Sequence, residues 1–221
     1  MEYFAPKEKF MDYLNITQSY ADFYGEYITP LTNAVEYVLA QTKIIAEQRQ
    51  SEIGINPVEN VKYRIKSPAS MTDKLRSHGL EVNADNAVHG VYDAAGVRII
   101  TSFLEDIEIM VERLKAVQGL RVISEKNYIR SPKENGYRSY HMICEVLSQE
   151  HIYIEIQLRT IAMDTWAAAD HQMQYKKLLS DSSVIAQELK RCAEELARVD
   201  MSLQRLSSVY MLQQKERNNT E

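Results

Sequence analysis

Strict alternation of apolar and polar residues from Ile152 to Arg159 is the feature that most limits how this chain can fold. Successive side chains of a β-strand point to opposite faces, so this pattern predicts a strand with one buried and one polar face. The chain has only seven glycines among 221 residues, about half the usual share of ~7%. Few tight turns are therefore available, which disfavours a many-stranded sandwich and a glycine-rich dinucleotide-binding fold.

The rest of the chain mixes helical and strand periodicity. Helical spacing of apolar residues runs from about 8 to 53, with Thr29-Pro30 predicted as the cap and first residue of a helix that restarts there. Further strands are predicted near 62–66, 97–100, 120–130 and 139–147, and further helices near 103–117 and 161–178. We expect one α+β structural domain made of an N-terminal helical segment (1–55), a central core (56–178) and a C-terminal helix with its tail (179–221).

The C-terminal helix carries apolar residues at alternating spacings of three and four. This heptad pattern fits two interpretations: the helix packs on its own sheet, or it forms a contact between subunits. We expect the polar tail from Lys215 to Glu221 to fray. The heptad residues are Leu189, Cys192, Leu196, Val199, Leu203, Leu206 and Tyr210.

Charge and cysteine content exclude several classes of protein. The net charge is −5, whereas a general nucleic-acid binder is usually basic, so a nucleic-acid partner is not expected. The two cysteines, Cys144 and Cys192, are far apart and indicate reduced thiols rather than a disulfide framework or a zinc site. The chain has neither a signal-peptide pattern nor about 18 uninterrupted apolar residues, so we expect a cytoplasmic protein without a membrane span.

Charged side chains from separate segments together suggest phosphoryl transfer. Glu155, Gln157 and Arg159 share the polar face of the alternating strand. Each charged group taken singly fits a solvated surface or a structural salt bridge. Two carboxylates for Mg²⁺ and several cations for phosphates are nevertheless the groups that phosphoryl transfer requires. The groups from other segments are Arg64, Lys66, Lys74, Asp93, Lys133, Tyr137 and Arg138.

Five sequence blocks resemble the synthetase domain of RelA/SpoT homologues, in order and spacing as well as in content. The similarity covers roughly residues 30 to 210 and is greatest to the stand-alone, RelQ-like small alarmone synthetases. The blocks are Tyr63-Arg64-Ile65-Lys66-Ser67-Pro68-Ala69-Ser70 with Lys74; Asp93-Ala94-Ala95-Gly96-Val97-Arg98-Ile99; Tyr128-Ile129 with Pro132-Lys133; Asn135-Gly136-Tyr137-Arg138-Ser139-Tyr140-His141; and Glu155-Ile156-Gln157-Leu158-Arg159-Thr160.

This resemblance implies a nucleotidyltransferase-like α+β fold, in which helices flank a mixed β-sheet. It also implies a GTP/GDP pyrophosphokinase that moves the β,γ-pyrophosphate of ATP to the ribose 3′-hydroxyl of GDP or GTP. The products would be AMP and the alarmone ppGpp or pppGpp of the stringent response. RelQ-like relatives form homotetramers, so the resemblance implies a homo-oligomer, namely a homotetramer, with terminal helices at the contacts.

The resemblance also assigns roles to individual residues. On the ATP side, Arg64 and Arg98 would sandwich the adenine, because flat guanidinium groups suit stacking, and two lysines would contact the phosphates: Lys66 and Lys74. Asp93 and Glu155 would hold Mg²⁺, with Glu155 beside the attacking hydroxyl as the candidate base. On the acceptor side, Tyr137 would stack on guanine, with these residues nearby: Lys133, Arg138, Gln157 and His141.

Two departures from the family pattern concern the site and its regulation. Ala94 replaces a large aliphatic residue after the metal aspartate, and Asp164 occupies a position where RelQ-like relatives can carry Asn. Because that position can border an allosteric or subunit surface, control by a bound alarmone is left open.

Other activities remain as alternatives. Some small relatives pyrophosphorylate adenine nucleotides or the 3′ end of tRNA, although the net charge of −5 disfavours a tRNA acceptor. A non-catalytic nucleotide- or RNA-binding scaffold would require loss of a metal carboxylate or of the acceptor tyrosine. These residues are all present, as Asp93, Glu155 and Tyr137. The chain has no His-Asp dipeptide of the family's hydrolase domain, so we expect synthesis without hydrolysis.

Overall fold

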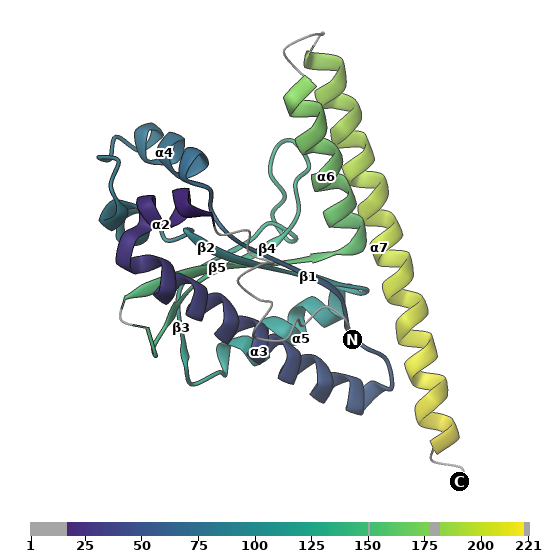
Figure 1. The fold of residues 1–221 in the computed structure, drawn as a ribbon. Coiled ribbons are helices and arrows are strands. Elements are labelled where there is room, and N and C mark those ends of the chain that lie inside the picture. Colours follow the sequence, from purple (N-terminus) through teal and green to yellow (C-terminus); the bar gives the residue numbers. More distant parts are fainter. Residues whose placement is uncertain (1–16, 150, 177–181, 219–221) are drawn as a thin grey trace.

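The computed structural model describes residues 17–149, 151–176 and 182–218, which are built around a five-stranded mixed sheet (Figure 1). The strand order is β1-β2-β5-β4-β3. The β2–β5 pair is parallel, and the other neighbouring pairs are antiparallel. The strands are β1 Val58–Ile65, β2 Ala95–Thr101, β3 Leu120–Asn127, β4 Tyr140–Val146 and β5 Ile152–Thr160. The predicted α+β class and mixed sheet are confirmed.

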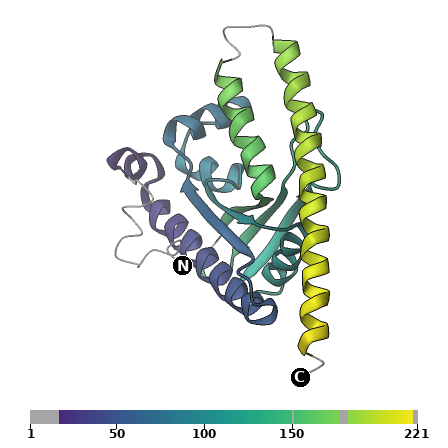
Figure 2. The same ribbon diagram turned by 90° about the vertical axis from the view of Figure 1, so that its right-hand side faces the viewer.

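Helices α3 and α5 pack against the sheet, while α6 rises from the end of the central strand β5 and runs beside the first part of α7 (Figures 1 and 2). The apolar face of β5 is closed by this packing: Ile152, Ile154, Ile156 and Leu158 are at most 1% exposed. The polar face of the same strand remains available for chemistry. The helical elements are α2 Gln18–Tyr24, η1 Gly25–Tyr27, α3 Ile28–Ile53, α4 Pro68–Ser77, η2 Asn86–Gly90, α5 Leu104–Lys115, α6 Ile161–Lys176 and α7 Ser182–Asn218.

The predicted N-terminal helix is interrupted earlier than expected. Residues 8–16 lie outside the described residues, and α2 ends at Gly25, which has a left-handed φ of 55°. Glycine adopts this conformation at little cost, so the chain changes direction there. Helix α3 then begins at Ile28, with Tyr27 rather than Thr29 as its N-cap. Pro30 fits in this first turn because the N–H that it lacks has no partner within a helix at that position.

Helix α7 is 37 residues long and, running back along α6, extends well past the point where α6 begins (Figures 1 and 2). Its inward positions are Ala193, Asp200 and Ser207, each at most 8% exposed. The heptad residues from Leu189 to Leu196 are half-buried, whereas the later ones are exposed by 40–66%. The exposed ones are Val199, Leu203, Leu206 and Tyr210. Helix packing on the chain's own core therefore accounts for only the first half of the heptad pattern.

The C-terminal end of the chain differs from its prediction, whereas the cysteines agree with theirs. The helix continues to Asn218, so residues 215–218 belong to α7 instead of a frayed tail, and 219–221 lie outside the described residues. Cys144 is buried, Cys192 is half-buried, and neither forms a disulfide. Burial raises the pKa of the Cys144 thiol to about 12, which keeps it protonated and unreactive. No helix among the described residues is long and apolar enough to cross a membrane.

Candidate active site

The polar face of three neighbouring strands forms the floor of the site. The register places Arg64 and Glu155 on either side of Gly96, and Lys62 and Gln157 on either side of Arg98. Because glycine has no side chain, the space above Gly96 stays open between β1 and β5. A Cβ added there would meet only the Glu155 carbonyl oxygen, at 3.7 Å.

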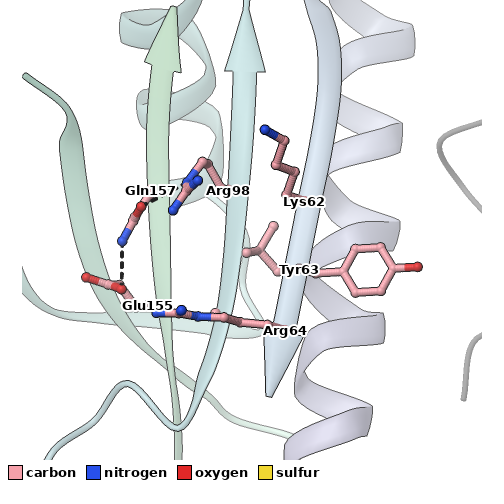
Figure 3. Close-up of a pocket in the computed structure, with 8 residues that line it drawn as sticks. Lys62, Tyr63, Arg64, Arg98, Glu155 and Gln157 are labelled. Carbon is pink, nitrogen blue, oxygen red and sulfur yellow. Dashed lines mark hydrogen bonds between the residues drawn. The ribbon is translucent and has the colours of Figure 1, made fainter. Parts of the chain in front are cut away.

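A cavity of about 180 Å³ lies over these strands, and we call it the first cavity (Figure 3). Figure 3 shows Arg64 and Arg98 reaching across the sheet surface from β1 and β2, whereas Tyr63 points away toward α3. Burial and the charge of Arg159 lower the pKa of Arg98, yet an arginine remains charged in proteins. The predicted arginine pair therefore does border one common space.

Asp93 is bound by the two predicted phosphate-contacting lysines. Its Oδ2 accepts a hydrogen bond from Lys66 Nζ at 2.5 Å and forms an ion pair with Lys74 Nζ at 2.7 Å. Lys74 is brought there by α4, whose start is capped by the Ser67 hydroxyl accepting from the Ser70 N–H. Tyr24 of α2 supports the cluster from below by donating to the Lys66 carbonyl at 2.7 Å. Sequence reasoning missed Tyr24, because nothing local links residue 24 to residue 66.

Glu155 is held ionised by its neighbours. Its Oε1 lies 3.0 Å from His141 Nδ1, and its Oε2 accepts a hydrogen bond from Gln157 Nε2 at 2.9 Å. Burial by itself would raise the pKa of Glu155, but the interactions with His141, Gln157 and Arg64 outweigh it and lower the pKa to about 2. Glu155 is thus ionised, the form that both a cation ligand and a general base require.

A second cavity of about 260 Å³ lies on the other side of Glu155. Glu155 lines both cavities, so this residue lies between the two spaces. The second cavity contains two predicted residues, Lys133 and His141, and two that sequence reasoning did not assign, Lys126 and Tyr128. Lys126 could have been found, since its two-residue spacing from Ser124 on β3 places both on one face of the strand.

Tyr137 stands beside this second cavity within a polar and aromatic network. Its hydroxyl lies 2.7 Å from His141 Nε2 and accepts a hydrogen bond from Arg159 Nη2 at 2.8 Å. Lys133 Nζ lies 5.0 Å from the centroid of the Tyr137 ring and 4.9 Å from that of Tyr128. A cation at this distance from an aromatic face is attracted to it, so Lys133 holds the two rings together.

Arg138 is not brought to either cavity. Its guanidinium donates to the carbonyls of Gly136 and Ala193, at 3.1 and 3.3 Å, and so ties the Gly136 turn to α7. It lines a separate small space between that turn, α6 and α7. The sequence suggested an acceptor contact because Arg138 follows Tyr137 directly, but adjacent residues in this turn point to different sides.

The residues at the site fit Mg²⁺. Asp93 Oδ1 is buried and has no hydrogen-bond partner among the described residues, so this oxygen is free to act as a ligand. The described residues contain no group of three or more acidic, histidine or cysteine side chains that could hold a metal. That arrangement suits Mg²⁺, which binds through one or two carboxylates together with substrate phosphates.

Comparison with known proteins identifies the family to which this site belongs. A region found in RelA/SpoT proteins matches residues 63–179. The chain therefore belongs to the RelA/SpoT family. It is 39% identical to the GTP pyrophosphokinase YwaC of Bacillus subtilis, over 73% of this chain and 79% of the relative. It is 32% identical to the GTP pyrophosphokinase YjbM of the same organism, over 79% of this chain and 83% of the relative.

Solved structures of two small alarmone synthetases are similar to this chain as well. Small alarmone synthetase 1 of Bacillus subtilis, bound to its product pppGpp, superposes with a TM-score of 0.72 at 31% identity, covering 82% of this chain and 95% of that one. Small alarmone synthetase 2 of the same organism has a TM-score of 0.71 at 36% identity, covering 80% and 94%. These structures share the fold predicted from the resemblance.

Proposed function

We propose that this protein transfers the β,γ-pyrophosphate of ATP to the ribose 3′-hydroxyl of GDP or GTP, producing AMP and ppGpp or pppGpp. The observation that carries the proposal is the position of Glu155, which lines both cavities. Two substrates bound on either side of one carboxylate would have their reacting groups next to each other. Bringing the reactants together in this way is a main source of catalysis in phosphoryl transfer.

The first cavity is proposed to bind ATP. Arg64 and Arg98 line it with planar cations that suit stacking on adenine. Lys66 and Lys74 lie at Asp93, where they would neutralise the phosphates as negative charge develops during transfer. Bound Mg²⁺ would add positive charge at the same phosphates, and the ligands available for it are Asp93 through its free Oδ1 and the ionised Glu155.

The second cavity is proposed to bind GDP or GTP. Tyr137 offers an aromatic ring for the guanine, and Lys133 and Lys126 offer charge for the 5′-phosphates. His141 and Gln157 keep the Glu155 oxygens in place, so that one of them can accept a hydrogen bond from the 3′-hydroxyl. We propose that Arg138 contributes indirectly, by fixing the loop that carries Tyr137 to α7.

Transfer of label from ATP carrying ³²P in its γ-phosphate tests this function. Labelled product is expected with GDP or GTP, and none is expected with ADP or with deacylated tRNA. Transfer to ADP or to tRNA would instead identify one of the alternative acceptors, and no transfer at all would favour a nucleotide-binding scaffold. Incubating purified ppGpp with the protein tests the expected absence of hydrolysis. Tyr137→Ala serves as the site control, since it should raise the KM for GDP much more than that for ATP.

We further propose a homo-oligomer, most simply a homotetramer, in which α7 supplies a contact between subunits. The support is the row of apolar side chains on the second half of α7, which the chain's own core leaves exposed. Burying one such leucine contributes about 1.5–3 kcal/mol, and symmetry repeats this gain in each subunit.

Three further statements remain sequence predictions: the division into segments 1–55, 56–178 and 179–221, the cytoplasmic location, and regulation by a bound alarmone.

A further inference from the structure

Asp164 lies at the junction of the two proposed substrate sites, although nothing in the proposed reaction assigns it a role. It is in the first turn of α6 and is 9% exposed. Its Oδ1 accepts hydrogen bonds from Arg98 Nη1 at 3.3 Å and from Arg159 Nη1 at 3.1 Å, and its Oδ2 accepts one from Lys62 Nζ at 2.7 Å. One carboxylate therefore binds three cations from β1, β2 and β5.

The contact with Arg98 fixes the orientation of a planar group. Arg98 donates from Nη1 to Asp164 and from Nε to Gln157 Oε1, the latter at 3.1 Å. Both hydrogen bonds use the edge of the guanidinium, so they hold its plane in one orientation. Arg98 lines the first cavity, and a guanidinium held in a fixed plane there is suited to stacking on a purine.

The contact with Arg159 connects Asp164 to Tyr137, beside the second cavity. The Arg159 side chain is 5% exposed, and its Nη2 donates to the Tyr137 hydroxyl and to Gln157. Its Cζ lies 5.2 Å from the centroid of the Tyr137 ring. Arg159 thus determines where Tyr137 stands, and Asp164 compensates the buried charge of Arg159. Without that carboxylate, Arg98 and Arg159 would face each other as unshielded like charges.

We propose that Asp164 is a positioning residue that acts through Arg98 on ATP and through Arg159 and Tyr137 on the acceptor. This inference rests on the proposed function of the two cavities. The first turn of α6 would then connect the two substrate sites. The family resemblance suggested an allosteric or subunit surface at this position instead. A salt bridge with a merely structural role would leave substrate affinities unchanged in any variant that still folds.

The test measures binding to Asp164→Asn, which keeps the shape of the side chain and removes its charge. Titration calorimetry with α,β-methylene-ATP and, separately, with GDP, both in Mg²⁺, should show each affinity reduced about tenfold or more, the usual effect of losing a charge-assisted hydrogen bond. Glu188→Gln, which removes one carboxylate from an exposed ion pair on α7, is the matched control and should bind both nucleotides like the wild type.

A double-mutant cycle separates positioning from general damage. In an Arg98→Gln background, Asp164→Asn should weaken α,β-methylene-ATP binding by less than twofold, since the residue through which it acts is gone. An equal loss in both backgrounds, or unchanged affinities in the single variant, would overturn the proposal. If Asp164→Asn does not fold, Asp164→Glu replaces it in the same cycle, with the same two outcomes. A wild-type protein that binds neither nucleotide would contradict the proposed function instead.

Discussion

Replacing Gly136 by alanine tests whether the turn that carries Tyr137 is fixed by α7. Gly136 has a left-handed φ of 91°, and a Cβ built on it would lie 2.6 Å from the Cβ of Ala193. The left-handed backbone costs an alanine about 1–2 kcal/mol, and crowding in a packed contact costs about 1–3 kcal/mol more. We therefore expect Gly136→Ala to lower the free energy of unfolding by about 2–5 kcal/mol.

Two further variants separate backbone strain from crowding. Gly54 also has a positive φ, 75°, but a Cβ there meets nothing within 4 Å, so Gly54→Ala should cost only the strain of about 1–2 kcal/mol. Ala193→Gly removes the methyl group that Gly136→Ala would strike, at a helix-propensity cost of about 1 kcal/mol. Combining Gly136→Ala with Ala193→Gly should therefore cost less than the sum of the single changes, with an interaction of about 1–3 kcal/mol.

Urea unfolding and steady-state kinetics provide the measurements. Unfolding is followed at one fixed protein concentration, because assembly would otherwise change the apparent stability. Since the turn carries Tyr137, Gly136→Ala should also raise the KM for GDP more than the KM for ATP, and Ala193→Gly should reverse part of that change. Equal destabilisation by Gly136→Ala and Gly54→Ala, with additive double-mutant energies and an unchanged KM for GDP, would refute the contact with α7.

Three other predictions concern the metal ligand, a buried acid and assembly. Asp93→Asn should abolish nearly all pyrophosphate transfer while the circular dichroism spectrum stays that of the wild type; substantial synthesis in Mg²⁺ would contradict its role as a ligand. Burial raises the pKa of Asp106 to about 6 despite the nearby Arg49, whereas the unfolded chain binds this proton only near the ordinary value of 3.8. The folded protein thus takes up the proton first, so between pH 7 and pH 5 the wild type should gain unfolding free energy relative to Asp106→Asn; a pH-independent difference in urea titrations would show that Asp106 titrates normally. Leu206, exposed by 66% on α7, should be part of the subunit contact, so Leu206→Asp should lower the mass in light scattering. Ser208→Asp, at an exposed position on another face of the same helix, should not. A wild-type protein that stays a monomer of about 25.5 kDa at all concentrations would end that hypothesis.

Local sequence patterns determined the elements, and the family resemblance of separate sequence blocks indicated most residues of the candidate site. The alternation in β5 predicted its buried and polar faces correctly, because side-chain direction in a strand depends only on position along the chain. The blocks around Arg64, Arg98 and Glu155 lie on paired strands that line one cavity, so residues recognised separately in the sequence do meet in space. These inferences needed no knowledge of how distant segments pack.

Tertiary structure alone decided which groups touch. Asp93 binds two lysines, from the end of β1 and from α4, and Arg138 turns to the α7 backbone instead of a cavity. Asp164 meets Arg98 because the parallel pairing of β2 and β5 brings α6 above both strands, a juxtaposition of residues 66 positions apart. Periodicity within one segment specifies its own faces, but partners across the fold depend on strand order, register and helix placement, which local spacing does not encode.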